Sequence, residues 1–261
     1  MIVRAVPQLS GISSCESIVC AAPQAMTDET EDSNNPAKAA YDDAKRHARE
    51  GQFAEALERH EWFHHHALEH EPAFYGVRLS FALSAWKELG EKYPPAMASL
   101  RRVRDEALAR VRASDASEEW FHDVVSINHT LGEDDATIAL FSEIEVADAD
   151  AAKRHFRYLK KVAFERAPDV FLAYTPDLVA YLVEQRRFYR GLAESRMRMA
   201  ESQPKLADSL CRATNKANEQ FDALCEQLIK LAKTAGRFEQ ASAMEQLVQH
   251  WRSPDDAEVD A

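Results

Sequence analysis

GQFAEAL at residues 51–57 and GRFEQA at residues 236–241 are two versions of one pattern, near the two ends of the chain. In each, a glycine follows a predicted helix, an aromatic residue stands two positions later and an alanine five positions later. Glycine is favoured just after a helix because the left-handed conformation needed there strains other residues. We interpret the aromatic residue as filling the space between two helices, and the alanine as allowing their close approach. The pattern predicts helical hairpins, which commonly stack into solenoids.

The composition also favours helices. Only 7 of the 261 residues are glycine, whereas large β-sheet proteins and nucleotide-binding α/β folds need more glycine in turns and phosphate loops. Alanine, leucine, glutamate and arginine dominate, and all are good helix formers. No stretch reads as a strand, so we predict an all-α chain.

The formal net charge of −12 argues against a general affinity for nucleic acid or for an anionic membrane. The charge is uneven, because residues 153–198 carry eleven Lys and Arg against five Asp and Glu. This basic middle could contact an acidic partner, or it could be a solvated face that balances its acidic neighbours. No apolar run reaches the roughly 18 residues of a membrane span. The four cysteines form no disulfide framework, which suits a reducing compartment, and we predict a cytoplasmic protein.

The chain divides into three parts. Residues 1–36 are predicted to be a disordered tail, with translation from Met26 or processing of residues 1–25 as open alternatives. Residues 37–252 are predicted to be the helical domain, and residues 253–261 an acidic flexible tail. Within the domain, helices are expected near 37–50, 53–70, 73–89, 95–112, 117–131, 134–146, 150–167, 176–186, 188–202, 205–235 and 238–251. The predicted turns fall at Gly51, Gly90, Gly132, about Arg186 and Gly236.

This organisation resembles the tetratricopeptide repeat (TPR) family, whose unit is about 34 residues. The first repeat has residues of the family's pattern in the family's order: Gly51, Phe53, Ala56, Leu57 and Pro72. The last repeat keeps Gly236, Phe238 and Ala241. The resemblance implies an α-solenoid of stacked helical hairpins with irregular repeats, and a scaffold that binds proteins or peptides without enzymatic chemistry.

In such a scaffold the first helices of successive pairs make the inner surface. We predict that this surface binds a protein or peptide segment, and the basic middle of the chain favours an acidic one. Its candidate partner-binding residues are Arg78, Trp86, Asn128, Arg157 and Lys160. Self-association through the last helices, giving a homo-oligomer, is an alternative use of the same architecture.

A histidine-rich stretch offers a competing function. HEWFH at residues 60–64 fits the HExxH pattern of zinc peptidases, in which two histidines one turn apart hold zinc and the glutamate is the general base. His60, His64 and His70 would then be the zinc ligands and Glu61 the base. However, Ala67 replaces the glycine that ends the helix in the long form of the motif. If the helix continues, His70 points about 120° away from His64, about 9 Å further along.

The other interpretation of these histidines is structural. His60 and His64 share a helical face with apolar residues such as Phe53, Leu57 and Phe63, which predicts that this face is packed. The two rings would then be neutral core groups, hydrogen-bonded to neighbouring helices. We favour this interpretation, and therefore predict no catalytic residue, no metal and no cofactor.

Overall fold

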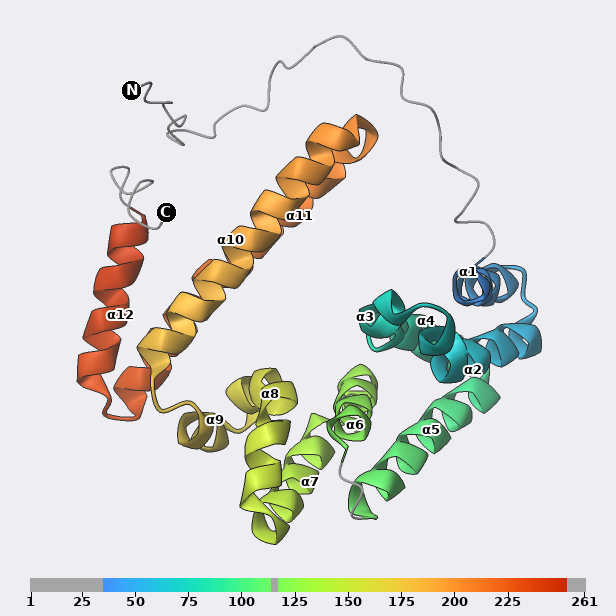
Figure 1. Cartoon of the computed structure of the whole chain (residues 1–261), viewed down its shortest axis with the longest axis horizontal. Helices are drawn as coiled ribbons and strands as arrows, with labels where there is room; N and C mark the ends of the chain where they lie inside the picture. The colour runs from blue at the N-terminus through green and yellow to red at the C-terminus, as the bar shows by residue number, and fades with distance from the viewer. Residues whose placement is uncertain (1–34, 114–116, 253–261) are drawn as a thin grey trace. The chain divides into compact units, whose positions relative to one another are not determined.

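The computed structural model describes residues 35–113 and 117–252 (Figure 1). Within these ranges the secondary structure is helical throughout and no strand is present, which confirms the predicted all-α class. Of the two predicted tails, only residues 35 and 36 are among the described residues. By their contacts the described residues form two compact units, 35–174 and 175–252, so the predicted helical domain comprises two units. No described helix has the length and apolar character needed to cross a bilayer.

The first hairpin consists of α1 (Pro36–Arg49) and α2 (Phe53–His70). Asn35 begins α1, because its Oδ1 accepts hydrogen bonds from the amides of Ala37 and Lys38 at 2.9 and 3.3 Å. Alanines at 37, 40 and 44 are buried on α1 and let it pack closely on α2. The hairpin turns at Gly51, whose φ is 78°.

Glycine terminates three helices as predicted. Gly132 and Gly236 share the left-handed conformation of Gly51, with φ of 76° and 72°. A residue with a Cβ atom is strained in this conformation. The predicted turns at these three positions are therefore confirmed.

The prediction of one continuous helix over residues 73–89 is wrong. The chain instead forms a 3-10 turn, η2 (Pro72–Phe74), then the short α3 (Tyr75–Arg78), and then α4 (Phe81–Lys92). Gly90 does not end a helix but lies buried inside α4. A Cβ atom at Gly90 would lie 3.0 Å from the Cα of Met97, so this glycine allows α5 to approach. The turn follows at Pro94, which begins α5 (Pro94–Arg112) because proline suits a helix's first position.

Four more helices complete the first unit: α6 (Glu118–Leu131), α7 (Asp134–Ala147), α8 (Ala149–Arg166) and α9 (Pro168–Tyr174). The first three were predicted, and α9 was not. Asp148 caps α8, with Oδ1 accepting from the amides of residues 150 and 151, both at 2.9 Å.

The helices of this unit pack in an alternating order. α4 contacts α2, α5 and α6, and α6 contacts α5, α7 and α8. α4, α6 and α8 thus form a row in which each contacts the next. The largest buried side chains in and beside this row are Leu83, Trp86, Leu100, Phe121, Ile127, Phe141 and Leu159.

The second unit contains α10 (Leu178–Ser202), η3 (Pro204–Leu206), α11 (Ala207–Thr234) and α12 (Phe238–Trp251). The turn predicted near Arg186 is wrong, because α10 runs through it. α10 and α11 form a long hairpin (Figure 1). α12 packs against both helices, and the core there contains Leu182, Leu228 and Met244. Between residues 183 and 216 no side chain is buried.

Candidate functional site

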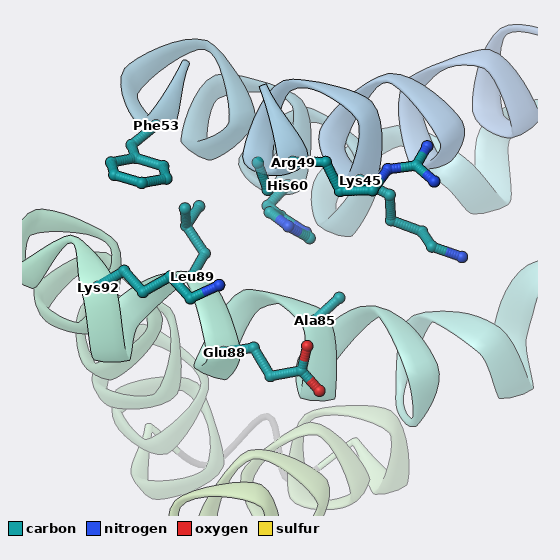
Figure 2. Close-up of a pocket in the computed structure, with 9 residues that line it drawn as sticks. Lys45, Arg49, Phe53, His60, Ala85, Glu88, Leu89 and Lys92 are labelled. Carbon is teal, nitrogen blue, oxygen red and sulfur yellow. The ribbon is translucent and has the colours of Figure 1, made fainter. Parts of the chain in front are cut away.

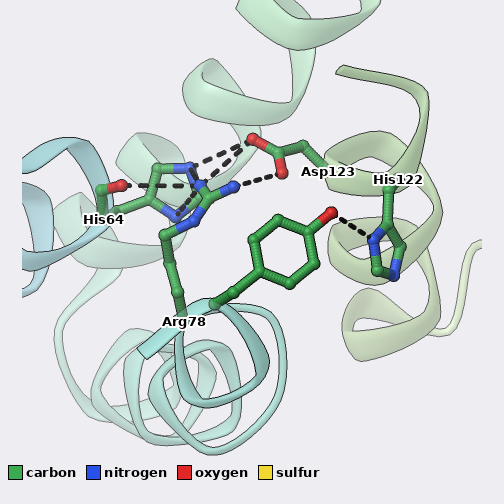
Figure 3. A network of polar contacts seen from close by, with 5 residues as sticks. His64, Arg78, His122 and Asp123 are labelled. Carbon is green, nitrogen blue, oxygen red and sulfur yellow. Dashed lines mark hydrogen bonds and ion pairs between the residues drawn. The ribbon is translucent and has the colours of Figure 1, made fainter. Parts of the chain in front are cut away.

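A cluster of polar and charged side chains is buried in the first unit (Figure 3). Arg78, at the end of α3, donates from both terminal nitrogens to the carboxylate of Asp123 on α6. The distance from Nη1 to Oδ2 is 3.1 Å. The same guanidinium lies 3.0 Å from Nε2 of His64 on α2. Arg78, Asp123 and His64 are only 7%, 3% and 6% exposed. The cluster therefore joins three helices through desolvated polar groups.

Burial sets the protonation states in this cluster. It raises the pKa of the Asp123 carboxyl above its ordinary value, and the charge of Arg78 offsets part of that rise. Burial and the positive charge of Arg78 hold the pKa of His64 well below its ordinary value. His64 is consequently neutral at pH 7, and its Nε2 accepts a hydrogen bond from Arg78.

A hydrogen-bonded pair, Tyr75 and His122, lies beside the Arg78 cluster (Figure 3). The Tyr75 hydroxyl lies 2.8 Å from Nδ1 of His122, and the His122 ring stacks on Tyr158 with 4.3 Å between centroids. Burial, with the charges of Arg78 and Arg157, lowers the pKa of His122 to about 4. Burial raises the pKa of Tyr75 to about 12. Tyr75 is thus the donor and neutral His122 the acceptor at pH 7.

A cavity of about 240 Å³ adjoins the Arg78 cluster. Its wall carries both signs of charge, since Glu106 and Glu119 face it together with Arg110. Arg110 also lies over the ring of Trp120, 4.5 Å from its centroid. Such a wall can hold a polar group, but its mixed charges favour neither an anion nor a cation.

The candidate zinc ligands and the candidate base do not converge on one point. His60 stacks on Trp86, with 5.8 Å between centroids, and His70 stacks on Trp62 at 5.5 Å. Glu61 forms an ion pair with Arg102 at 2.8 Å and accepts a hydrogen bond from Ser99. No group of three or more His, Cys, Asp or Glu side chains in the described ranges is placed to hold a metal ion. A cation bound at His64 would also lie beside the Arg78 guanidinium, which would repel it.

The predicted packing of His60 and His64 is confirmed in part. Both rings are buried, and His64 is hydrogen-bonded as expected. His60 differs, because its buried Nε2 has no hydrogen-bond partner. Burial lowers the pKa of His60 to about 4, so this unsatisfied ring is neutral at pH 7.

Three of the five predicted partner-binding residues are buried. Trp86 and Asn128 are each 1% exposed, and Arg78 lies in the cluster described above. Asn128 donates to Thr137 and accepts from Arg104, both at 3.0 Å. The prediction that these three side chains line an exposed surface is wrong, because they face neighbouring helices.

The other two predicted residues are on α8. Arg157 is exposed, with a guanidinium that pairs with Glu118 at 2.6 Å and lies over the ring of Tyr158. Lys160 is half-buried. A role for these two residues in partner binding remains a prediction.

Sequence reasoning missed a cleft between α1, α2 and α4 (Figure 2). Lys45 and Arg49 stand one helical turn apart on α1 and face the cleft, and Lys92 faces it from the end of α4. The spacing of the first two residues was a usable signal, since positions i and i+4 share a helix face. The position of Lys92 was not, because it depends on where the chain turns after residue 70.

No protein-family model matches the chain, and neither the curated proteins nor the solved structures contain a significant match.

Proposed function

We propose that residues 35–174 form a TPR-like solenoid that acts as a non-enzymatic scaffold and binds a segment of another protein. The observation that carries this proposal is the alternating packing of the unit. α4, α6 and α8 each contact the next in the row, while α5 and α7 fill the second layer. Helical hairpins stacked in this order build extended surfaces that are used for protein recognition.

The interior contacts of the unit also favour binding over catalysis. Several buried polar residues are engaged with one another, as in the Arg78–Asp123 pair and in the bond between Asn128 and Thr137. Such contacts fix the angles between helices. They leave recognition to the surface, where exposed cations such as Arg157 would attract an acidic segment.

Identification of a bound protein, followed by measurement of its affinity, tests this function. The full chain is immobilised, partners from an extract of the native cells are identified by mass spectrometry, and the strongest is purified. We expect the Arg157→Glu/Lys160→Glu variant to weaken its binding by roughly tenfold or more. Lys153→Glu, on the same helix, is the control and should change binding little.

Two results would count against this proposal. Purified chain that retains no protein from the extract would contradict the scaffold itself. Full binding by the Arg157→Glu/Lys160→Glu variant would show instead that a partner is bound elsewhere than at α8.

A further inference from the structure

The cleft between α1, α2 and α4 has a volume of about 250 Å³ (Figure 2). Its apolar part comes from Phe53 and Leu89, with the small side chains of Ala48 and Ala85 beside them. Pockets that enclose drug-sized ligands or cofactors typically measure about 300–1,000 Å³. The smaller cleft suits one or two side chains of a peptide better than a nucleotide.

The rim of the cleft is cationic, in a chain whose net charge is −12. Lys45 and Arg49 face it from α1 and Lys92 from α4, against a single carboxylate, Glu88. The side chains of Arg49, Lys92 and Glu88 form no hydrogen bond or ion pair with any described residue. The ammonium of Lys45 lies over the ring of Tyr41, 4.9 Å from its centroid. Arg49 and Lys92 are thus available to bind an anionic ligand. The carboxylate of Glu88 would repel ligands that carry several negative charges.

A buried polar atom adds an independent reason. His60 extends from α2 toward the cleft (Figure 2), is 2% exposed, and has an Nε2 with no hydrogen-bond partner. An unsatisfied buried polar atom destabilises the folded state, because the atom has lost its hydrogen bonds to water without replacement. By contrast His64, four residues away, has its Nε2 engaged by Arg78 at 3.0 Å. A ligand oxygen that reached His60 would remove this cost.

We propose that this cleft binds an acidic side chain of a peptide segment, with an adjacent apolar side chain seated on Phe53 and Leu89. Arg49 and Lys92 attract the carboxylate from the two sides of the cleft, and His60 supplies a hydrogen bond at its base. The inference rests on the proposed scaffold function and gives that function a second, defined site, distinct from α8.

Selection from a random peptide library tests the proposal without knowledge of the natural partner. Phage that display random 12-residue peptides are selected on the full chain, and enriched sequences are synthesised for affinity measurements by fluorescence anisotropy. We expect enrichment of peptides in which Asp or Glu lies next to a large apolar residue. Replacing that acid by its amide should weaken binding by roughly tenfold or more.

Paired variants locate the binding site. Arg49→Glu/Lys92→Glu should weaken binding of the selected peptides by roughly tenfold or more, and Arg49→Gln/Lys92→Gln by less. Arg59→Glu/Lys87→Glu changes the charge equally on α2 and α4 but outside the cleft, and should change binding by less than about threefold. Thermal unfolding of each variant shows whether it remains folded, and the Gln pair serves if the Glu pair does not.

The outcomes separate the two proposals. Acidic peptides that bind the Arg49 and Lys92 variants normally would overturn the cleft as their site, while the scaffold function would stand. Enrichment of neutral or basic peptides would do the same. If no peptide sequence is enriched, the cleft as a peptide site is overturned, while the scaffold function is still decided by the capture of partners from the cell extract.

Discussion

Asp123 and Arg78 show how single residues hold the first unit together. A buried ion pair does not necessarily stabilise a protein relative to well-packed apolar residues, because both ions lose their hydration. Here the pair and His64 connect α2, α3 and α6. Its contribution is therefore to fix one arrangement of these helices, and removing one ion should cost more than removing both.

Replacement of Asp123 by Asn tests this asymmetry. The change leaves the Arg78 guanidinium buried without its counter-ion, which should lower the free energy of unfolding by about 3–5 kcal/mol. The Arg78→Met/Asp123→Leu variant removes both charges and should be closer to wild type than Asp123→Asn. Urea unfolding measures both changes. Equal or larger loss in the double variant would show that the ion pair itself is a net stabilising contact.

A second prediction at the scale of single residues concerns the effect of Gly90→Ala on stability. Alanine is favoured over glycine inside a helix by about 1 kcal/mol, but a Cβ atom here would lie 3.0 Å from Met97. We expect Gly90→Ala to destabilise the protein in spite of its higher propensity. Gly76→Ala is the control, since its Cβ atom would meet no atom within 4 Å, and it should be neutral or stabilising. A stabilised Gly90→Ala protein would mean that α5 can move away at little cost.

At the scale of helices, the sequence predicted boundaries best where one residue type has one local effect. Gly51, Gly132 and Gly236 ended helices because the left-handed conformation is a local property of the backbone. Gly90 was misread because its role is a contact with α5, which depends on tertiary packing. The side-chain cluster at Arg78 was missed for a similar reason, since the break at residues 79–80 separates α3 from α4 and no local signal marked it.

We predict that the two halves of the α10–α11 hairpin differ in local stability. Its half nearest α12 contains the buried Leu182, Cys225 and Leu228, whereas residues 183–216 bury no side chain. Helices without tertiary packing are marginal in water. Amide hydrogen exchange should therefore be roughly tenfold or more faster over residues 190–216 than over 222–232. Equal protection of the two segments would show that the far half of the hairpin is covered in solution.

At the scale of the whole unit, buried neutral histidines should make residues 35–174 sensitive to acid. The pKa of His60 and that of His122 are each lowered to about 4, against an ordinary value near 6.5. The unfolded chain therefore binds protons that the folded chain does not. Their effect is absent well above pH 6.5, and stability is lost as the pH falls from about 6.5 toward 4. For His60 alone the loss is on the order of 3 kcal/mol.

Unfolding by urea at pH 7, 6, 5 and 4 measures this dependence. Trp251→Phe leaves Trp62, Trp86 and Trp120 as fluorescence reporters of the first unit alone. In that background, His60→Leu should reduce the loss of stability between pH 6.5 and 4. His129→Gln, at an exposed ion-paired histidine, is the control and should leave the loss caused by the buried rings unchanged. A pH dependence unaltered by His60→Leu would contradict a buried neutral ring at this position.

The most direct test of the account is whether a bound peptide reaches His60. Long-range ¹H–¹⁵N spectra of the full chain resolve the ring nitrogens of individual histidines, and they can be recorded before and after addition of a selected acidic peptide. The account predicts that the His60 signals shift as binding saturates, while those of the exposed His129 do not. Saturated binding with unchanged His60 signals would contradict the cleft between α1, α2 and α4 as the binding site.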